Sequence, residues 1–256
     1  MNLFLDLKIL SKEYKSQPKK IGFLTENWVD KQIYCPNCGE LKIDKYEDSR
    51  PVADFFCSHC KEEYELKSKK DSMGNRILDG AYGTMIKRLN SANNPNFFFL
   101  NYNLDSYKVL NFAVIPKHFF VPEIIIKRGK GLKDRPEYIM CSIDLTLIPR
   151  SGKIFYIKDG HEEGREKVLE NWEKTLFLRE EKEISAKGWL LDVMMCVDKL
   201  GHKDFSLNEV YAFENELSEK HPDNRHIKDK IRQQLQILRD KGYLDFAGRG
   251  IYRLKL

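Results

Sequence analysis

The sequence predicts an α/β domain that carries an inserted metal site, followed by a small C-terminal domain built mostly of helices. Three observations support this prediction. Two Cys-x-x-Cys pairs have 18 residues between them, continuous apolar runs at residues 97–102 and 109–116 are typical of strands buried on both faces, and helical periodicity follows a charged linker near residue 182. We therefore expect two domains, residues 1–181 and residues 182–256.

Composition narrows the class of protein. The 256 residues are 41% hydrophobic and 32% charged, and no apolar run approaches the ~20 residues that cross a bilayer, so we do not expect a membrane protein. Residues 1–14 place apolar side chains at helical spacing with charges among them, which predicts a docking helix and not a signal peptide. Six cysteines without an export signal indicate a reducing compartment, and hence a cytoplasmic protein.

The first hundred residues alternate between predicted helices and strands. A helix is expected over residues 25–33, with Thr25 as its N-cap. Alternating runs at residues 50–56 and 62–68 predict two strands joined by the second cysteine pair. Residues 79–96 predict a helix that ends in an Asn-Pro turn. The apolar face of this helix is expected to consist of Ala81, Met85, Ile86 and Leu89.

Later segments complete the predicted α/β core. The buried strands at residues 97–102 and 109–116 are followed by residues 127–138, which hold five basic residues without periodicity and are expected to form an exposed loop. A further strand is expected at residues 153–160, and a helix around Trp172 leads to the linker.

The two cysteine pairs have the spacing of a structural zinc site. Each pair forms a tight turn that directs two thiolates at one tetrahedral ion, and Gly39 supplies permissive backbone after the first pair. Four thiolates leave no open coordination position, so we expect zinc to stabilise the fold and not to catalyse. His59 is expected to be exposed, whereas Cys141 and Cys196 lack partner spacing and are interpreted as core residues. The predicted zinc ligands are Cys35, Cys38, Cys57 and Cys60.

An aspartate and a Glu-x-Lys flank the second cysteine pair. Side chains alternate along a strand, so Glu65 and Lys67 share one face, and a hairpin brings Asp54 opposite them. Carboxylates that hold Mg²⁺ against a phosphodiester neutralise charge and acidify a bound water, while an ammonium stabilises the transition state. The alternative is a solvated cross-strand ion pair, but burial of these strands makes unpaired charge costly. Glu13 or Glu26 is a further candidate acid.

This pattern resembles the PD-(D/E)XK nucleases. The resemblance implies that Asp54 and Glu65 bind Mg²⁺ together with the backbone carbonyl of Leu66, and that Lys67 is the catalytic amine. The zinc turn lies three residues after Asp54 and five before Glu65, so it is expected to hold these groups in position.

The last 75 residues predict a small DNA-binding domain. Residues 182–224 hold five Lys and Arg against nine Asp and Glu, a balance of −4, whereas residues 225–256 hold nine against three, a balance of +6. Amphipathic helices over residues 184–200, 206–220 and 225–242 precede two short strands, the order of a winged helix, with Ser206 and Glu209 forming a capping box. The candidate DNA-binding residues are His226, Lys228, Lys230, Arg232, Gln233 and Gln234 of the third helix and Arg249 of the wing, and the alternative for each is a solvated surface.

Six segments together resemble the DpnI type of methyl-directed restriction endonuclease: YCPNCG, RPVADF, ELKSKK, DGAY, NNPNFFFL and IKDKIRQQLQILRDK. The resemblance covers essentially the whole chain. It implies a bacterial cytoplasmic enzyme, expected to be a monomer, that cleaves double-stranded DNA at GATC sites carrying N6-methyladenine, with Mg²⁺ for hydrolysis and zinc for structure. The loop at residues 127–138 differs most from this family and ends in Tyr138, where an aromatic residue near the DNA is expected.

Two other functions remain open on the sequence. One is a zinc-containing winged-helix regulator that binds DNA without cutting it, in which the acids only complete the fold. The other is a nuclease that is independent of methylation or acts in repair. The presence of Asp54, Glu65 and Lys67 together favours a nuclease.

Overall fold

The structure is a computed structural model whose residues group into two compact units. The first unit comprises Met1–Thr146 and Gly152–Glu173, and the second comprises Leu147–Ser151 and Lys174–Leu256. The boundary predicted at residues 181/182 stays a prediction. The residues that the structure describes are 1–10, 16–47, 53–89, 94–181 and 183–255.

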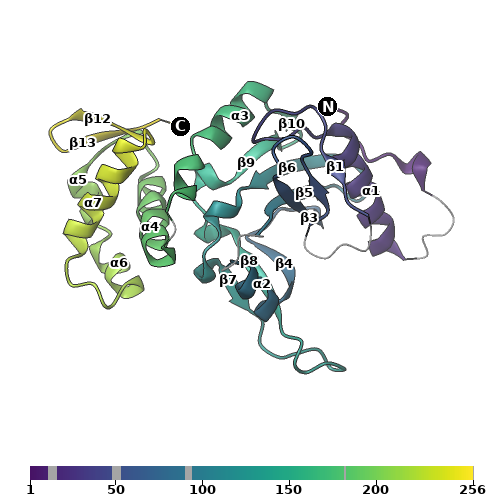
Figure 1. Cartoon of the computed structure of the whole chain (residues 1–256), viewed down its shortest axis with the longest axis horizontal. Helices are drawn as coiled ribbons and strands as arrows, with labels where there is room; N and C mark the ends of the chain where they lie inside the picture. The colour runs from purple at the N-terminus through teal and green to yellow at the C-terminus, as the bar shows by residue number, and fades with distance from the viewer. Residues whose placement is uncertain (11–15, 48–52, 90–93, 182, 256) are drawn as a thin grey trace. The chain divides into compact units, whose positions relative to one another are not determined.

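A seven-stranded mixed sheet forms the centre of the first unit (Figure 1). Strands β3 and β5 are parallel, and every other neighbouring pair is antiparallel. In order across the sheet the strands are β1 (Asp44–Lys45), β2 (Phe55–Phe56), β3 (Glu63–Lys70), β5 (Asn96–Tyr102), β6 (Val109–Ile115), β9 (Ile154–Lys158) and β10 (His161–Glu162).

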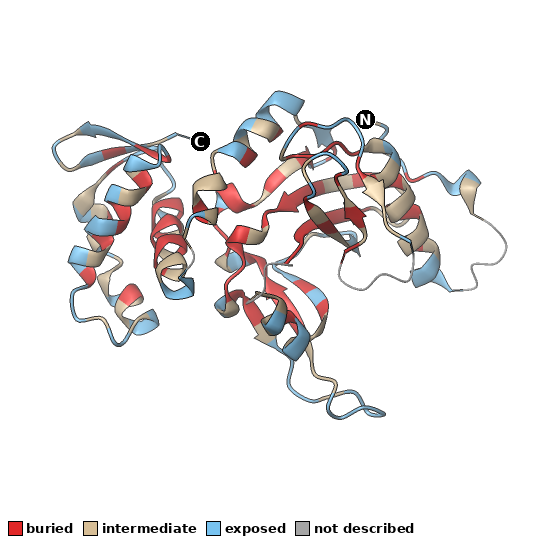
Figure 2. Ribbon diagram, viewed as in Figure 1, coloured by how far each residue is buried: buried red, intermediate tan, exposed pale blue. Residues whose placement is uncertain are grey.

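The predicted strands at residues 97–102, 109–116 and 153–160 are confirmed, and they build the core. All seven residues of β5 are buried, because both faces of this central strand are covered (Figure 2). The Tyr64 ring of β3 stacks on the Phe98 ring of β5 with centroids 4.4 Å apart, and Phe98 in turn packs on Phe112 of β6. This aromatic cluster packs β3 against the central strands of the sheet.

The connection from β3 to β5 contains a strand and a helix of its own. Parallel neighbours require a crossover, and here it consists of β4 (Arg76–Ala81) and α2 (Tyr82–Leu89). Strand β4 joins a second, antiparallel sheet in the order β4-β8-β7. The other two strands of this sheet are β7 (Ile125–Lys127) and β8 (Met140–Asp144).

The helix predicted over residues 79–96 was wrong at its start, since α2 begins at Tyr82. Residues 79–81 pair with β8 instead, with a register shift between Asp79 and Ala81, because β8 offers backbone partners that helical periodicity does not reveal. On the predicted apolar face only Met85 is buried, and the other three residues are half-buried.

Two further helices pack on the large sheet, α1 (Gln17–Gln32) near β3 and α3 (Arg165–Glu173) on β9. The prediction that a helix starts at Thr25 was wrong. Thr25 is buried within α1 and donates its hydroxyl to the backbone oxygen of Ile21 at 2.9 Å, whereas the helix starts beside Pro18, which suits a first turn.

The N-terminal docking helix was also wrong for the residues that the structure describes. Only Leu7–Ile9 form a short 3-10 helix, and Phe4 pairs with Lys108 through an isolated β-bridge. Residues 11–15 lie outside the description. The other 3-10 helices are Lys117–Phe119, Pro122–Ile124, Leu145–Leu147, Arg150–Gly152 and Leu176–Arg179.

The two strands predicted around the second cysteine pair are present, but the first is short. Strand β2 comprises only Phe55–Phe56, and residues 50–52 of the predicted strand are not described.

Residues 127–138 connect β7 to β8 and are mostly exposed, as predicted. Among the described residues, no helix combines the length and the apolar character needed to span a membrane.

The second unit contains four helices and a three-stranded sheet in the order β11-β13-β12. The capping box of Ser206 and Glu209 is confirmed at the start of α5, but the predicted helix 206–220 is interrupted after Tyr211. The elements are α4 (Ile184–Leu200), β11 (Asp204–Ser206), α5 (Leu207–Tyr211), α6 (Glu214–Lys220), α7 (Ile227–Asp240), β12 (Leu244–Gly248) and β13 (Ile251–Leu254).

Gln234 is not available as a base-reading residue, which corrects the prediction. Its exposure is 3%, because it follows Ile231 by three residues and so falls on the inner face of α7, which also buries Leu235 and Leu238. The predicted fold class, a mixed α/β domain with a large sheet and a small C-terminal helical domain, is confirmed.

Candidate functional site

The four predicted zinc ligands meet at one point. All four Sγ atoms lie within 4.8 Å of one another, with Cys35 and Cys60 3.5 Å apart and Cys38 and Cys57 3.6 Å apart. Four thiolates at the Zn–S distance of ~2.3 Å in a tetrahedron would be about 3.8 Å apart. The donors and their spacing therefore fit a zinc ion with a complete thiolate shell.

Each cysteine pair sits in the same kind of backbone turn. The amide of Gly39 donates to the Cys35 oxygen, and the amide of Lys61 donates to the Cys57 oxygen, both at 2.9 Å. Both donors adopt left-handed φ values, +76° for Gly39 and +63° for Lys61. The glycine is favoured at the first turn because a Cβ there would approach the Arg165 guanidinium to 3.1 Å.

The surroundings of the cluster suit a bound cation. Burial raises the pKa of the Cys35 thiol, so a thiolate at this position requires a compensating positive charge. The hydroxyl of Tyr64 lies 3.2 Å from Cys35 Sγ and links the cluster to the aromatic core. His59 is exposed and outside the cluster, as predicted, and Cys141 and Cys196 are buried elsewhere.

The second cysteine pair lies between β2, which directly follows Asp54, and β3, which carries Glu65. Strand β2 pairs antiparallel with β3, and the Asp54 amide donates to the Tyr64 oxygen at 2.9 Å. The Asp54 carboxylate then accepts the amide hydrogen of Leu66 at 2.6 Å, which extends the ladder beyond the end of β2. Asp54 is thereby attached to β3 through both its backbone and its side chain.

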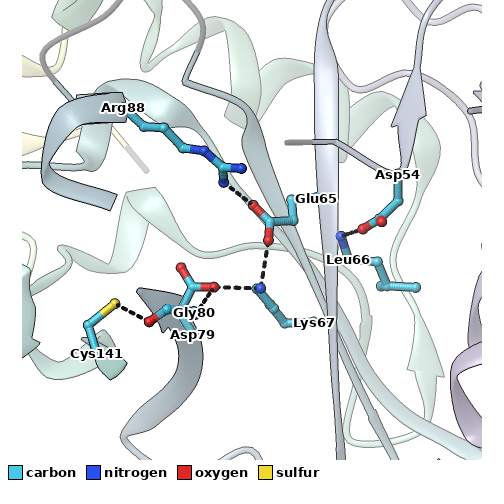
Figure 3. Close-up of polar contacts among 8 residues, drawn as sticks. All are labelled: Asp54, Glu65, Leu66, Lys67, Asp79, Gly80, Arg88 and Cys141. Carbon is cyan, nitrogen blue, oxygen red and sulfur yellow. Dashed lines mark hydrogen bonds and ion pairs between the residues drawn. The ribbon is translucent and has the colours of Figure 1, made fainter. Parts of the chain in front are cut away.

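Lys67 lies between two carboxylates (Figure 3). Its Nζ atom is 2.6 Å from Glu65 Oε1 and 2.6 Å from Asp79 Oδ1. Asp79 also accepts the amide of Gly80 at 2.8 Å, and Arg88 Nη1 contacts Glu65 Oε2 at 3.2 Å. Two residues of β3 are thus joined by ion pairs to two residues of the crossover between β3 and β5.

Asp79 is an acid of this cluster that the sequence analysis missed. The helix predicted over residues 79–96 concealed it, because the Asp-Gly at its start was assigned to that helix and not to a strand end. A signal was present, since an isolated glycine after an aspartate often marks a bulge or turn. The structure shows a register shift at this position of β4.

The cluster is largely buried, which controls its ionisation. Burial raises the pKa of Glu65, and the neighbouring Lys67 offsets this only in part. Burial lowers the pKa of Lys67, but Glu65 and Asp79 outweigh it, so the pKa of Lys67 is raised and its ammonium is retained at neutral pH. Burial also raises the pKa of Asp54, opposed by the Leu66 amide.

A cavity of about 270 Å³ opens onto this cluster. A second cavity of about 410 Å³ adjoins it, and the two share Ala81, Thr84 and Tyr138 as lining residues. Tyr138, which ends the exposed loop, therefore lies beside the acids and the amine. The first cavity is lined by Glu65, Lys67, Asp79, Gly80, Ala81, Thr84, Met85, Arg88 and Tyr138.

The predicted acids do not all share one face. Figure 3 shows the Asp54 carboxylate turned to the Leu66 backbone and apart from the Glu65 and Lys67 side chains. Of the described His, Cys, Asp and Glu residues, only the four cysteines form a group of three or more that could share one ion. Glu26 pairs instead with Lys45 at 2.8 Å, and Glu13 is not described.

Except for the buried Gln234, the predicted DNA-binding residues of the second unit lie on the outer side of α7 and on the wing. His226, Arg232 and Gln233 are exposed, and Lys230 is half-buried. Lys228 is exposed and pairs with Glu214 of α6 at 3.1 Å. Arg249 lies in the exposed turn between β12 and β13.

These features together define a class of protein. A mixed α/β domain with an acid–amine cluster and a four-cysteine site, followed by a helical domain with a basic final helix, is typical of a DNA-binding protein.

Comparison with family models places the chain within this class. A model described as DpnI, Dam-replacing family, matches residues 1–181, and a model described as Dam-replacing HTH domain matches residues 185–254. The chain therefore belongs to the DpnI, or Dam-replacing, family. The resemblance stated from the sequence is confirmed, and family membership supports the assignment as a methyl-directed restriction endonuclease that contains a DNA-binding helix-turn-helix domain.

Replacing one cluster cysteine should remove the metal and loosen the first unit. For Cys38→Ser we expect zinc content, measured by mass spectrometry of the purified protein, to fall from one ion per chain to background. The melting temperature should fall by about 10 °C or more, because a structural zinc contributes several kcal/mol to folding. Cys196→Ser is the matched control and should keep its zinc; equal metal content in both variants would refute the four-thiolate site.

Removing the buried charge of Asp54 should stabilise the fold. Because its pKa is raised, the stability that the neutral acid provides is present below the ordinary value near pH 4 and is lost as pH rises through the raised value. Asp54→Asn keeps an acceptor for the Leu66 amide but does not titrate. Without added divalent cation, we expect its melting temperature to exceed that of the wild type by about 2–4 °C at pH 7 and to match it near pH 4. A lower melting temperature at pH 7 would show that the charge stabilises the fold.

Proposed function

We propose that this protein is a type II methyl-directed restriction endonuclease that hydrolyses double-stranded DNA at GATC sites carrying N6-methyladenine. The observation that carries the proposal is Lys67, whose ammonium lies 2.6 Å from the carboxylates of both Glu65 and Asp79 beside the four-cysteine site. Membership of the DpnI family supports the choice of a methylated DNA target. The proposed functional domains are residues 1–181 and 182–256.

Hydrolysis of a phosphodiester requires help because the substrate is an anion that repels hydroxide. Mg²⁺, the proposed cofactor, supplies charge neutralisation and a more acidic bound water. Asp54, Glu65 and the backbone carbonyl of Leu66 would hold it, since oxygen donors suit a hard cation. To do so, the Asp54 carboxylate, which accepts the Leu66 amide hydrogen in this structure, would turn toward Glu65. Zinc at the four cysteines has a structural role in this proposal, since its coordination shell has no vacancy.

Lys67 is the proposed catalytic amine. Its ammonium orients the attacking water and stabilises the negative charge that builds up on the phosphorane-like transition state. Asp79 holds this amine on the side opposite Glu65, so that one carboxylate can bind elsewhere while the other keeps the amine in place. The contacts of Lys67 and Asp79 within the 270 Å³ cavity support these proposed roles.

Target recognition is assigned to both domains. One buried methyl contributes ~0.8 kcal/mol, which gives only a few-fold preference, so two readers that each sense a methyl multiply the discrimination. In the second domain the proposed DNA contacts are the predicted residues whose side chains are exposed or half-buried. In the first domain the proposed DNA contact is Tyr138. The contacts of the second domain are His226, Lys228, Lys230, Arg232, Gln233 and Arg249.

The proposed setting is the bacterial cytoplasm, where the protein acts as a monomer on DNA. A reducing compartment keeps the four thiolates available for zinc.

A plasmid assay separates this function from its rivals. With Mg²⁺, we expect linearised product from plasmid methylated at adenine in GATC and intact unmethylated plasmid. Cutting of neither substrate would favour a DNA-binding regulator, and equal cutting of both would favour a nuclease that ignores methylation. Asp54→Ala should lose cleavage but bind methylated duplex with an affinity within about twofold of the wild type, because the residue acts on the metal and not on DNA recognition. Asp105→Ala, an exposed acid in the turn after β5, is the control and should cleave normally.

A further inference from the structure

Both oxygens of the Glu65 carboxylate are occupied by cationic side chains. Lys67 Nζ contacts Oε1 at 2.6 Å, and Arg88 Nη1 contacts Oε2 at 3.2 Å. The side chains of Glu65 and Arg88 are only 15% and 21% exposed, so water does little to weaken this pair. A cation that binds Glu65 has to compete with Arg88 for Oε2.

The charges of the cavity are balanced as they stand. Glu65 and Asp79 provide two negative charges, and Lys67 and Arg88 provide two positive charges. A divalent cation added to this group leaves an excess of positive charge, which disfavours binding unless a cation leaves or an anion arrives. A DNA phosphate is the anion that the proposed reaction brings to this site.

Resting on the proposed function, we propose that Arg88 exchanges partners during the reaction. It pairs with Glu65 in the metal-free protein and turns to a DNA phosphate when Mg²⁺ occupies Glu65. In this arrangement Arg88 makes metal binding weak in the absence of DNA and contributes to DNA binding when the metal is present. The Mg²⁺ and the substrate therefore favour each other's binding.

The position of Arg88 allows this exchange. It projects from α2, the helix of the crossover, toward Glu65 (Figure 3). It also lines the 270 Å³ cavity together with Thr84 and Tyr138. The guanidinium has space beside it within this cavity. Its planar set of donors suits two phosphate oxygens as well as it suits a carboxylate, which makes arginine the side chain that can serve both partners.

Calorimetric titration of zinc-loaded protein with MgCl₂, without DNA, tests the first half of the proposal. For Arg88→Gln we expect the Mg²⁺ dissociation constant to fall about tenfold relative to the wild type, because the competing guanidinium is removed. The matched control is Lys87→Gln, which removes one exposed positive charge from the same helix without touching Glu65. Its dissociation constant should stay within about twofold of the wild type.

Single-turnover cleavage at saturating Mg²⁺ tests the second half. Arg88→Gln should cleave methylated DNA about tenfold or more slowly, because a donor to the phosphate is lost. Tighter metal binding together with slower cleavage is the expected signature. A merely structural role would weaken both, since a disordered cavity holds neither Mg²⁺ nor DNA well.

The possible outcomes distinguish a failure of the Arg88 inference from a failure of the proposed function. Unchanged or weaker Mg²⁺ binding by folded Arg88→Gln overturns the inference, and tighter binding with unchanged cleavage overturns the phosphate contact. A wild type that takes up no Mg²⁺ even when methylated duplex is present refutes the proposed function itself. Should Arg88→Gln not fold, the side-chain Nε–H signal of Arg88, identified by its loss in Arg88→Lys, replaces the calorimetry. It should shift when the wild type is saturated with Mg²⁺, and an unmoved signal overturns the exchange.

Discussion

Four thiolates that converge on one point constrain the rest of the first unit. Strand β2 has only two residues, too few to hold a register by itself, yet it must present Asp54 to β3. With zinc bound, the cysteine turn between β2 and β3 would replace the missing strand length with coordination bonds. The Tyr64 ring also packs β3 against the aromatic core. Zinc binding at these cysteines would then be coupled to strand pairing in this hairpin.

The second constraint is charge balance around β3. Its Glu65 and Lys67 carry opposite charges on one face, and the crossover between parallel strands supplies Asp79 and Arg88 as their partners. These ion pairs link the two elements, and in the proposed exchange they compete with a cation for the carboxylates. In the proposed exchange, this site is stable without substrate and rearranges when a DNA phosphate arrives, a compromise between stability and activity that functional sites often show.

Sequence patterns predicted best those features that depend on neighbours along the chain. The spacing of the cysteines predicted their meeting, and the apolar runs predicted β5 and β6. Prediction failed at Asp79 because a distant segment decides its structure: Asp79 pairs with β8, so it is in a strand and not in a helix. Thr25 lies inside a helix that begins at Gln17, a start that the nearby Pro18 indicates. Gln234 illustrates a simpler error, since its position on α7 already placed it on the inner face. Lys67 lies on the large sheet, whereas its partner Asp79 lies on the second sheet. No periodicity of the local sequence predicts a contact between two sheets.

Hydrogen exchange at the Leu66 amide is the most direct test of the central claim that the thiolate-bound ion holds the acid-bearing hairpin on β3. This amide donates to Asp54 at 2.6 Å, and the Phe99 amide of β5 serves as the reference within the same sheet. We predict that Leu66 is protected in zinc-loaded protein and exchanges about a hundredfold or more faster after the zinc is removed, while Phe99 stays protected. Equal protection of Leu66 with and without zinc would contradict the account.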